Sequence, residues 1–216
     1  DHHSQGGSFD TARLVADKIY HWQAPVSFRY DFIGLKGIPG KMSSSKGTVI
    51  SLTEVLNVYQ PEVTRYLFAS TRPNTEFAIS FDLDVIKIYE DYDKTERIAW
   101  GIDKAKNDEV YAKERRIYEL SQIDGMPPCC SYQIPFRHLC NLLQINAGDI
   151  AAVIALMTDL KEEQYERFVA RANCAWFWIT ECAPEDFRFQ LRRSGEKAEL
   201  SAAETAAGRS IREQLL

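Results

Sequence analysis

The chain has 216 residues, of which 45% are hydrophobic and 26% are charged, as in an ordinary globular protein. Its net charge of -5 excludes a protein that coats nucleic acid by charge alone, although a local basic patch remains compatible with it. No apolar run approaches the length of a membrane-spanning helix. The length suits one large domain or two smaller ones.

The first fifty residues combine helical and extended patterns. Residues 10–21 predict a short helix, and VSFRYDFIGLKG (26–37) is rich in β-branched and aromatic residues, which predicts one or two strands. Glycines at 34, 37 and 40 then favour turns.

The loop GKMSSSKGTVISL (40–52) contains two lysines, three consecutive serines and flanking glycines. The ammonium groups of Lys41 and Lys46 can neutralise a polyphosphate, and the hydroxyl and backbone N–H groups can donate to its oxygens. Its spacing is not that of a Walker A loop. From composition alone, a solvent-exposed linker is the favoured alternative to a phosphate site.

Helical signals dominate from Ser51 onward. SLTE (51–54) is a capping-box pattern, and Pro61 stands where a helix would begin. Residues 70–84 predict a loop with room for a short extended segment. A long helix is expected from Asp84 to Gly101, with an apolar stripe formed by Val85, Ile88, Tyr92 and Ala99.

The second half of the chain predicts a helical array. Helices are expected over 104–122, over 136–145, after a cap at Asn146 with Asp149 in the first turn, and over 162–183. The apolar stripe of the last comprises Tyr165, Phe168, Val169, Ala172, Trp176, Ile179 and Ala183. A second capping box, Ser201 with Glu204, opens a final helix. The proline-rich connector 124–135 is the expected domain boundary.

Five cysteines stand at positions 129, 130, 140, 174 and 182. Their number is odd, two are adjacent, and no CxxC pair exists. Cys140, Cys174 and Cys182 fall within apolar helical patterns. We therefore expect buried thiols in a reduced, cytosolic setting and no metal site.

The loop KMSSSKG, followed by TVISL, resembles the KMSKS loop of class I aminoacyl-tRNA synthetases, which closes over the triphosphate of ATP. Residues Lys41, Met42, Ser43, Ser44 and Ser45 match its five positions in order. The family's usual lysine at the fourth position is Ser44 here, and the next lysine is Lys46. This form is similar to the class I lysyl-tRNA synthetases. The resemblance implies that all six residues bind ATP, with Lys46 first and Lys41 second as catalytic residues.

Two neighbouring segments extend the resemblance. DHHSQGGSFDTAR (1–13) resembles the family's DHxSxGGSYDT segment, which implies that Asp1 contacts ATP and His2 the substrate; a frayed terminus is the alternative. FRYDFIGLKG (28–37) resembles the strand before the loop, which implies that Tyr30 helps to form the lysine pocket. An aromatic ring suits lysine because it covers the alkyl stem and can face the ammonium. A half-buried strand aromatic is an equally good interpretation of Tyr30.

The rest of the chain resembles the segments that follow in the family. The implied fold is mainly α, with the C-terminal remnant of a Rossmann-type α/β catalytic domain before an α-helical array. The expected parts are catalytic in 1–52, a stem-contact module in 53–123, and the start of an anticodon-binding domain in 124–216. No HIGH-type motif occurs, since the four histidines lack the required glycine two residues on. We therefore expect the chain to begin inside the catalytic domain and to be inactive alone.

The resemblance implies ATP-dependent ligation of lysine to its tRNA through a lysyl-adenylate, in the cytoplasm and without a membrane. ATP would enter with Mg²⁺ as a substrate, and lysine and tRNA would be the other partners. Two alternatives stay open, namely a non-catalytic RNA-binding helical module and a class I synthetase for another amino acid.

Contact with RNA is not localised by the sequence. Three pairs of residues are small cationic spots, Arg115–Arg116, Arg137–His138 and Arg192–Arg193, and a solvated helix face is the favoured interpretation of each. Trp178 could stack on a base. Because Phe177 and Trp178 lie off the main stripe of their helix, packing against a neighbouring helix is favoured instead.

Overall fold

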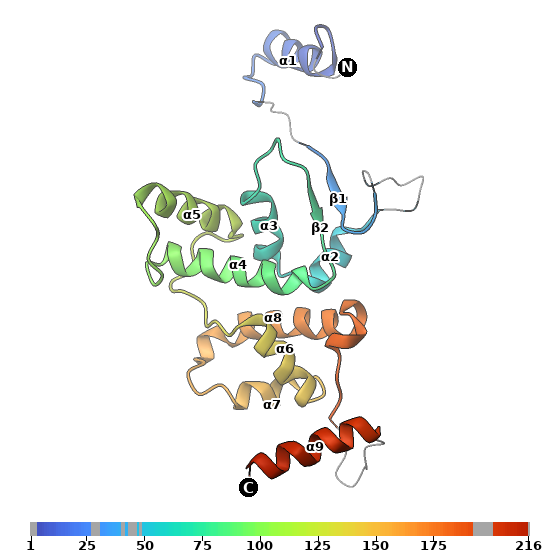
Figure 1. Ribbon diagram of the computed structural model, residues 1–216. Coiled ribbons are helices and arrows are strands. Elements are labelled where there is room, and N and C mark those ends of the chain that lie inside the picture. Colours follow the sequence, from blue (N-terminus) through green and yellow to red (C-terminus); the bar gives the residue numbers. More distant parts are fainter. Residues whose placement is uncertain are drawn as a thin grey trace.

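The computed structural model describes residues 4–26, 31–39, 42, 47, 49–191 and 201–215. Within these residues the fold is mainly helical, with one two-stranded parallel sheet, which confirms the mainly α prediction (Figure 1). The strands are β1 (Ile33–Leu35) and β2 (Phe77–Ile79). The α-helices are α1 (Ser8–Lys18), α2 (Leu52–Val58), α3 (Pro61–Ala69), α4 (Asp84–Ala99), α5 (Asp108–Ser121), α6 (Phe136–Ile145), α7 (Ile150–Ala155), α8 (Tyr165–Phe177) and α9 (Ala202–Leu215).

The parallel sheet joins segments that lie far apart in the sequence. Strand β1 pairs with β2 in a register that places Gly34 opposite Ala78. The connection between the two strands contains the serine-rich loop, α2 and α3. Parallel strands require such a crossover, because the chain must return to the same end of the sheet before the second strand begins.

Local capping signals position the helices as the sequence predicts. The Ser51 side chain accepts a hydrogen bond from the Glu54 backbone at 3.2 Å, and the Glu54 carboxylate accepts one from the Ser51 backbone at 2.8 Å. Pro61 is the first residue of α3, where its missing N–H costs nothing. The second capping box is also formed, since Ser201 and Glu204 exchange the same bonds.

The turn between α6 and α7 differs from the prediction. Asn146 ends α6 and donates its side-chain amide to the Leu142 carbonyl at 2.8 Å. The cap of α7 is instead Asp149, whose carboxylate accepts from the Ala152 backbone at 3.0 Å. Gly148 has a φ of 83°, and a Cβ there would come within 2.4 Å of the Trp176 ring. This tight approach and the positive φ both require glycine at position 148.

A single apolar core runs through the helices on both sides of the 124–135 connector. It unites, among others, Val58, Tyr89, Phe136, Leu143 and Trp178, none of which is exposed. Figure 1 shows α4 between α3 and α5 on one side and α6 and α8 on the other. Helix α4 is therefore covered on two faces, which explains why its buried residues extend beyond the predicted stripe.

Helix α8 is also buried on more than one face. It begins with a short 3-10 turn (Glu162–Gln164) and ends in a π-helical turn (Trp178–Cys182). Tyr165 from the predicted stripe is exposed, whereas Trp178 is fully buried and donates its indole N–H to the Phe81 carbonyl at 2.9 Å. The base-stacking interpretation of Trp178 is therefore wrong, and its packing against a neighbouring element is confirmed.

None of the described helices combines the length and the apolar character that crossing a membrane would need.

Candidate functional site

The candidate site begins where the two parallel strands end. Lys36 directly follows β1, and Ser80 directly follows β2, so both lie at the same edge of the sheet. In open α/β sheets, ligands bind at the carboxyl ends of parallel strands. In the sequence, the serine-rich loop begins a few residues after β1.

An ion cluster occupies this edge. The Lys36 ammonium pairs with Asp84 and lies 3.0 Å from the Asp82 carboxylate. Asp82 also accepts hydrogen bonds from the Ser80 hydroxyl at 2.6 Å and the Asp84 backbone at 2.9 Å. Ser80, the Asp84 backbone and Lys36 lower the pKa of Asp82 to about 2, while the hydrogen bonds that Lys36 donates to Asp84 and Asp82 raise the pKa of Lys36. The cluster thus stays charged around neutral pH and ties the end of β1 to the start of α4.

Both ends of the loop are fixed to regular structure. On the near side, Gly37 turns the chain with a φ of 84°, and Ile38 pairs back with Leu35 through an isolated bridge. On the far side, the capping box at Ser51 begins α2. Within the loop, Gly47 has a φ of 67°, a conformation that glycine adopts without strain. The loop is therefore joined to regular structure at both ends.

A tyrosine of the core holds the chain in place just after β2. The Tyr59 hydroxyl donates to the Ser80 carbonyl at 2.5 Å, and Tyr59 itself is fully buried. Burial raises the pKa of the Tyr59 phenol, which keeps it a neutral donor. The neighbouring Tyr89 hydroxyl donates to the Val58 carbonyl at 3.0 Å. These bonds connect the site edge to the centre of the protein.

The predicted site residues lie almost entirely outside the described residues. The predicted site residues outside the described part of the chain are Asp1, His2, Tyr30, Lys41, Ser43, Ser44, Ser45 and Lys46. Met42 is described and is half-buried. The structure therefore defines the surroundings of the loop rather than its contacts.

Sequence reasoning missed the ion cluster. Lys36 directly follows β1, Asp82 is the third residue after β2, and Asp84 begins α4. The signal that would have found them is the position of charged residues just after two short strands.

Two of the three predicted cationic spots, Arg115–Arg116 and Arg137–His138, lie on exposed helix faces in the described part of the chain. Arg115 and Arg116 both pair with Glu119, at 3.2 and 3.3 Å. The guanidinium of Arg137 lies over the Phe187 ring at 5.5 Å from its centroid. Arg192 and Arg193 lie outside the described residues.

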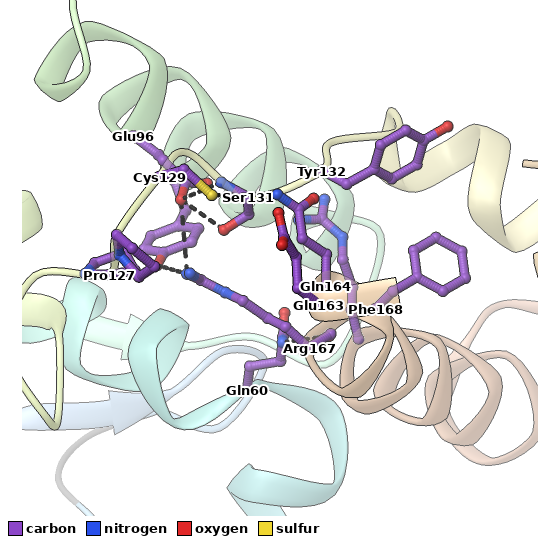
Figure 2. Close-up of a pocket in the computed structure, with 13 residues that line it drawn as sticks. Gln60, Glu96, Pro127, Cys129, Ser131, Tyr132, Glu163, Gln164, Arg167 and Phe168 are labelled. Atoms are coloured by element: carbon purple, nitrogen blue, oxygen red, sulfur yellow. Dashed lines mark hydrogen bonds and ion pairs between the residues drawn. The ribbon is translucent and has the colours of Figure 1, made fainter. Parts of the chain in front are cut away.

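A second group of charges is buried between α4 and α8. Arg171 makes a bidentate pair with Asp93, with both N–O distances at 2.6 Å and both side chains at most 7% exposed. Next to it, Glu96 is 1% exposed and accepts from the Tyr118 hydroxyl at 2.6 Å. Burial raises the pKa of Glu96, but Arg167 and these hydrogen bonds outweigh it and hold the pKa below its ordinary value (Figure 2). No local pattern marks these groups, because charged residues on an amphipathic helix normally face solvent.

The cysteines of the described residues are all free thiols. Cys140 and Cys174 are buried as expected, and burial raises their pKa to about 12 and about 11. No group of three or more metal-ligating side chains occurs in the described part of the chain.

Comparison with known proteins defines the class to which this fold and loop belong. The family described as "tRNA synthetases class I (K)" matches residues 1–124, and the chain belongs to this family. The chain is 67% identical to a lysine–tRNA ligase of Treponema pallidum, over all of this chain and 41% of the relative. It is 52% identical to a lysine–tRNA ligase of Borreliella burgdorferi, over 93% of this chain and 38% of the relative. An archaeal lysine–tRNA ligase, from Thermococcus kodakarensis, is 35% identical over 93% of this chain and 39% of its own length.

The chain therefore spans about two fifths of the length of the curated relatives it matches.

Proposed function

We propose that the protein containing this chain joins lysine to tRNA at the expense of ATP. The observation that carries this proposal is the 67% identity to a lysine–tRNA ligase along the entire chain. The position of the signature loop is compatible with this proposal. The loop follows β1, at whose carboxyl end a nucleotide is expected to bind, and it ends at the capping box of α2.

The reaction has two steps. The carboxylate of lysine attacks the α-phosphorus of ATP, which forms lysyl-adenylate and releases pyrophosphate. The terminal ribose hydroxyl of tRNA then attacks the lysyl carbonyl and releases AMP. The first step needs charge stabilisation on the leaving pyrophosphate more than it needs a protein nucleophile.

In this proposal the loop supplies that charge stabilisation. Lys46 is the first candidate for the pyrophosphate contact and Lys41 the second, while Met42 and the serines 43–45 contribute to ATP binding. Lys36 does not compete for this role, because Asp82 and Asp84 already neutralise it.

Further parts of the site complete the proposal. Asp1 would contact ATP, His2 the substrate, and Tyr30 the lysine pocket. Residues 1–52 would be the end of a Rossmann-type catalytic domain, 53–123 the stem-contact module, and 124–216 the start of the anticodon-binding domain. The protein would act in the cytoplasm, on a lysine-accepting tRNA.

Magnesium would arrive bound to the phosphates of ATP. The described residues offer no cluster of three ligands for a resident ion, and the carboxylates of Asp82 and Asp84 are engaged by Lys36. The protein's own contribution is therefore to position the nucleotide and to supply positive charge from the loop.

Exchange of labelled pyrophosphate into ATP tests the function on the full-length protein. We expect exchange with lysine and none with arginine, glutamate or cysteine. Replacing Lys46→Ala should lower the exchange rate about 100-fold with a much smaller effect on the KM for lysine, because the contact forms in the transition state. Lys113→Ala removes an exposed charge from α5 and is the matched control. Exchange supported by another amino acid and not by lysine would refute the specificity, and no exchange at all would favour a non-catalytic RNA-binding protein.

A further inference from the structure

A short connection, residues 36–39, joins the end of β1 to the signature loop. Its first residue, Lys36, is held in two ways. The Lys36 backbone N–H donates to the Ile79 carbonyl at 2.9 Å, which continues the pairing with β2. The Lys36 ammonium pairs with both Asp82 and Asp84. The backbone and the side chain of this one residue therefore set the direction in which the chain leaves β1.

The segment that carries these carboxylates is itself held by the core. The Trp178 indole donates to the Phe81 carbonyl at 2.9 Å, and the Tyr59 hydroxyl donates to the Ser80 carbonyl at 2.5 Å. Both of these rings are fully buried. The Ser80 hydroxyl in turn donates to the Asp82 carboxylate at 2.6 Å. Asp82 is thus positioned from the core through its own neighbours, and it presents its carboxylate to the end of β1.

The ion cluster of Lys36, Asp82 and Asp84 is too exposed to contribute much to stability. These side chains are 46 to 48% exposed, and water and salt weaken the attraction between such charges. The small free energy of the cluster nevertheless selects one orientation of the connection among those open to a free chain. If only that orientation is productive, the whole of this free energy appears in the rate of the reaction, as a change of several fold.

The reaction proposed for this protein depends strongly on where the lysines of the signature loop lie. Positive charge stabilises the leaving pyrophosphate only if the ammonium groups reach its oxygens, and a displacement of about 1 Å can cost as much as 100-fold in rate. Lys41 follows the connection by only two residues in the sequence. The direction that is set at Lys36 therefore affects the position of the first loop lysine.

We propose that Lys36 is a positioning residue for the activation of lysine, and that Asp82 and Asp84 hold it so that the chain leaves β1 toward the phosphates of ATP. The proposal rests on the proposed function, because that function supplies the reaction. It differs from a direct role, in which the Lys36 ammonium would leave the carboxylates and contact a phosphate. The two roles predict opposite effects when the acidic side chains lose their charge.

Pyrophosphate exchange by the full-length protein, with saturating ATP and a lysine tRNA transcript, measures the role of the Lys36 ammonium. Lys36→Met keeps the alkyl stem and removes the charge, and we expect kcat to fall about fivefold with an unchanged KM for lysine. Lys36→Arg keeps the charge and should retain most of the wild-type rate. Titration of active sites with labelled ATP gives the fraction of competent protein, so misfolding would lower that fraction and not the rate per site. A wild-type rate for Lys36→Met, or an arginine variant as slow as the methionine variant, overturns the proposal.

The double variant Asp82→Asn with Asp84→Asn separates positioning from direct contact. Both substitutions keep the shape of the side chain and remove the charges that hold Lys36. Positioning predicts exchange that is slower by about the same fivefold, whereas direct contact predicts equal or faster exchange because the ammonium is released. Adding Lys36→Met to the double variant should cause no further loss, since the three side chains act as one unit. Equal or faster exchange by the double variant contradicts the positioning role.

Lys87→Met is the matched control. Lys87 is an exposed lysine that pairs with Asp91 one turn further along α4, and we expect wild-type exchange without it. If this variant were as slow as Lys36→Met, a general loss of positive charge would explain both, and the positioning role would be wrong. Lysine-dependent exchange by the wild type and by Lys36→Met at the same rate refutes this role and leaves the proposed function standing. No exchange by the wild type refutes both.

Discussion

The ion cluster of Lys36, Asp82 and Asp84, called the loop edge below, and the α4–α8 interface use the same kinds of charged residue in opposite ways. At the loop edge, Lys36 and the acids Asp82 and Asp84 remain 46 to 48% exposed. At the interface, Arg171 and Asp93 are only 7% and 5% exposed and are aligned by two short hydrogen bonds.

This difference in exposure determines what each region contributes to the fold. Exposed ion pairs contribute little to stability, because water competes for both charges and salt screens them. A buried pair contributes specificity, since neither partner can be removed without leaving a charge in an apolar surrounding. The loop edge is therefore adjustable, whereas the interface holds the helices in one arrangement.

The largest effect should come from breaking the buried pair. Asp93→Ala leaves the Arg171 guanidinium uncompensated beside the stacked rings of Tyr89 and Phe136, and should lower the free energy of unfolding by about 3–5 kcal/mol. Urea denaturation followed by tryptophan fluorescence measures it. The double variant Asp93→Leu with Arg171→Met should recover most of the loss, because no charge then remains buried. A double variant as unstable as the single one would show that packing, not charge, dominates here.

An intermediate effect is expected at the point where the core supports the loop edge. Tyr59→Phe removes the bond to the Ser80 carbonyl and leaves that acceptor buried, which should cost about 1–1.5 kcal/mol of unfolding free energy. Tyr20→Phe is the control, because Tyr20 is 72% exposed. Equal stability of the two variants in urea would mean that Ser80 finds another donor.

A similar or smaller loss of stability is expected from removing the capping box at Ser51, which fixes the far end of the loop. Ser51→Ala removes the acceptor for the Glu54 backbone and should lower the free energy of unfolding by about 1 kcal/mol. Thr53→Ala, an exposed position in the first turn of the same helix, is the control. If both variants melted at the temperature of the wild type, the capping box would have no energetic role in this anchor.

The smallest effect should be the acid sensitivity of the loop edge. The pKa of Asp82 is lowered from 3.8 to about 2, so its stabilising contribution is complete above pH 3.8 and is lost as the pH falls toward 2. Because the side chain is about half exposed, the contribution should stay below about 1 kcal/mol. Asp82→Asn should remove this part of the pH dependence, as measured by urea denaturation from pH 5 to 2. An identical pH profile in the variant would assign the acid sensitivity to other carboxylates.

The sequence predicted features that depend on a few neighbouring residues. The capping boxes at Ser51 and Ser201 and the position of Pro61 were all confirmed, because each signal lies within one helical turn. The prediction of Asn146 as the cap of α7 was wrong, because Asn146 closes α6 by donating its backbone N–H and its side-chain amide to the Leu142 carbonyl. Asp149, which the sequence placed in the first turn, is the cap instead.

Long-range features were not predictable from pattern alone. The pairing of β1 with β2 connects segments more than forty residues apart, and nothing in either segment identifies its partner. The burial of Arg171 was not predictable for a related reason. Arginine on an amphipathic helix is normally exposed, and here the carboxylate of Asp93 compensates the buried charge. The loop motif identified the family, but the residues that support it, such as Lys36, emerged only from the structure.

The buried pair also constrains how this protein can be divided or recombined. Asp93 and Arg171 lie on opposite sides of the 124–135 connector, within one continuous core. A chimaera that took its later helices from a distant relative would have to inherit both members of the pair or neither. The connector is thus a boundary in sequence but not a point at which evolution or an engineer can exchange halves freely.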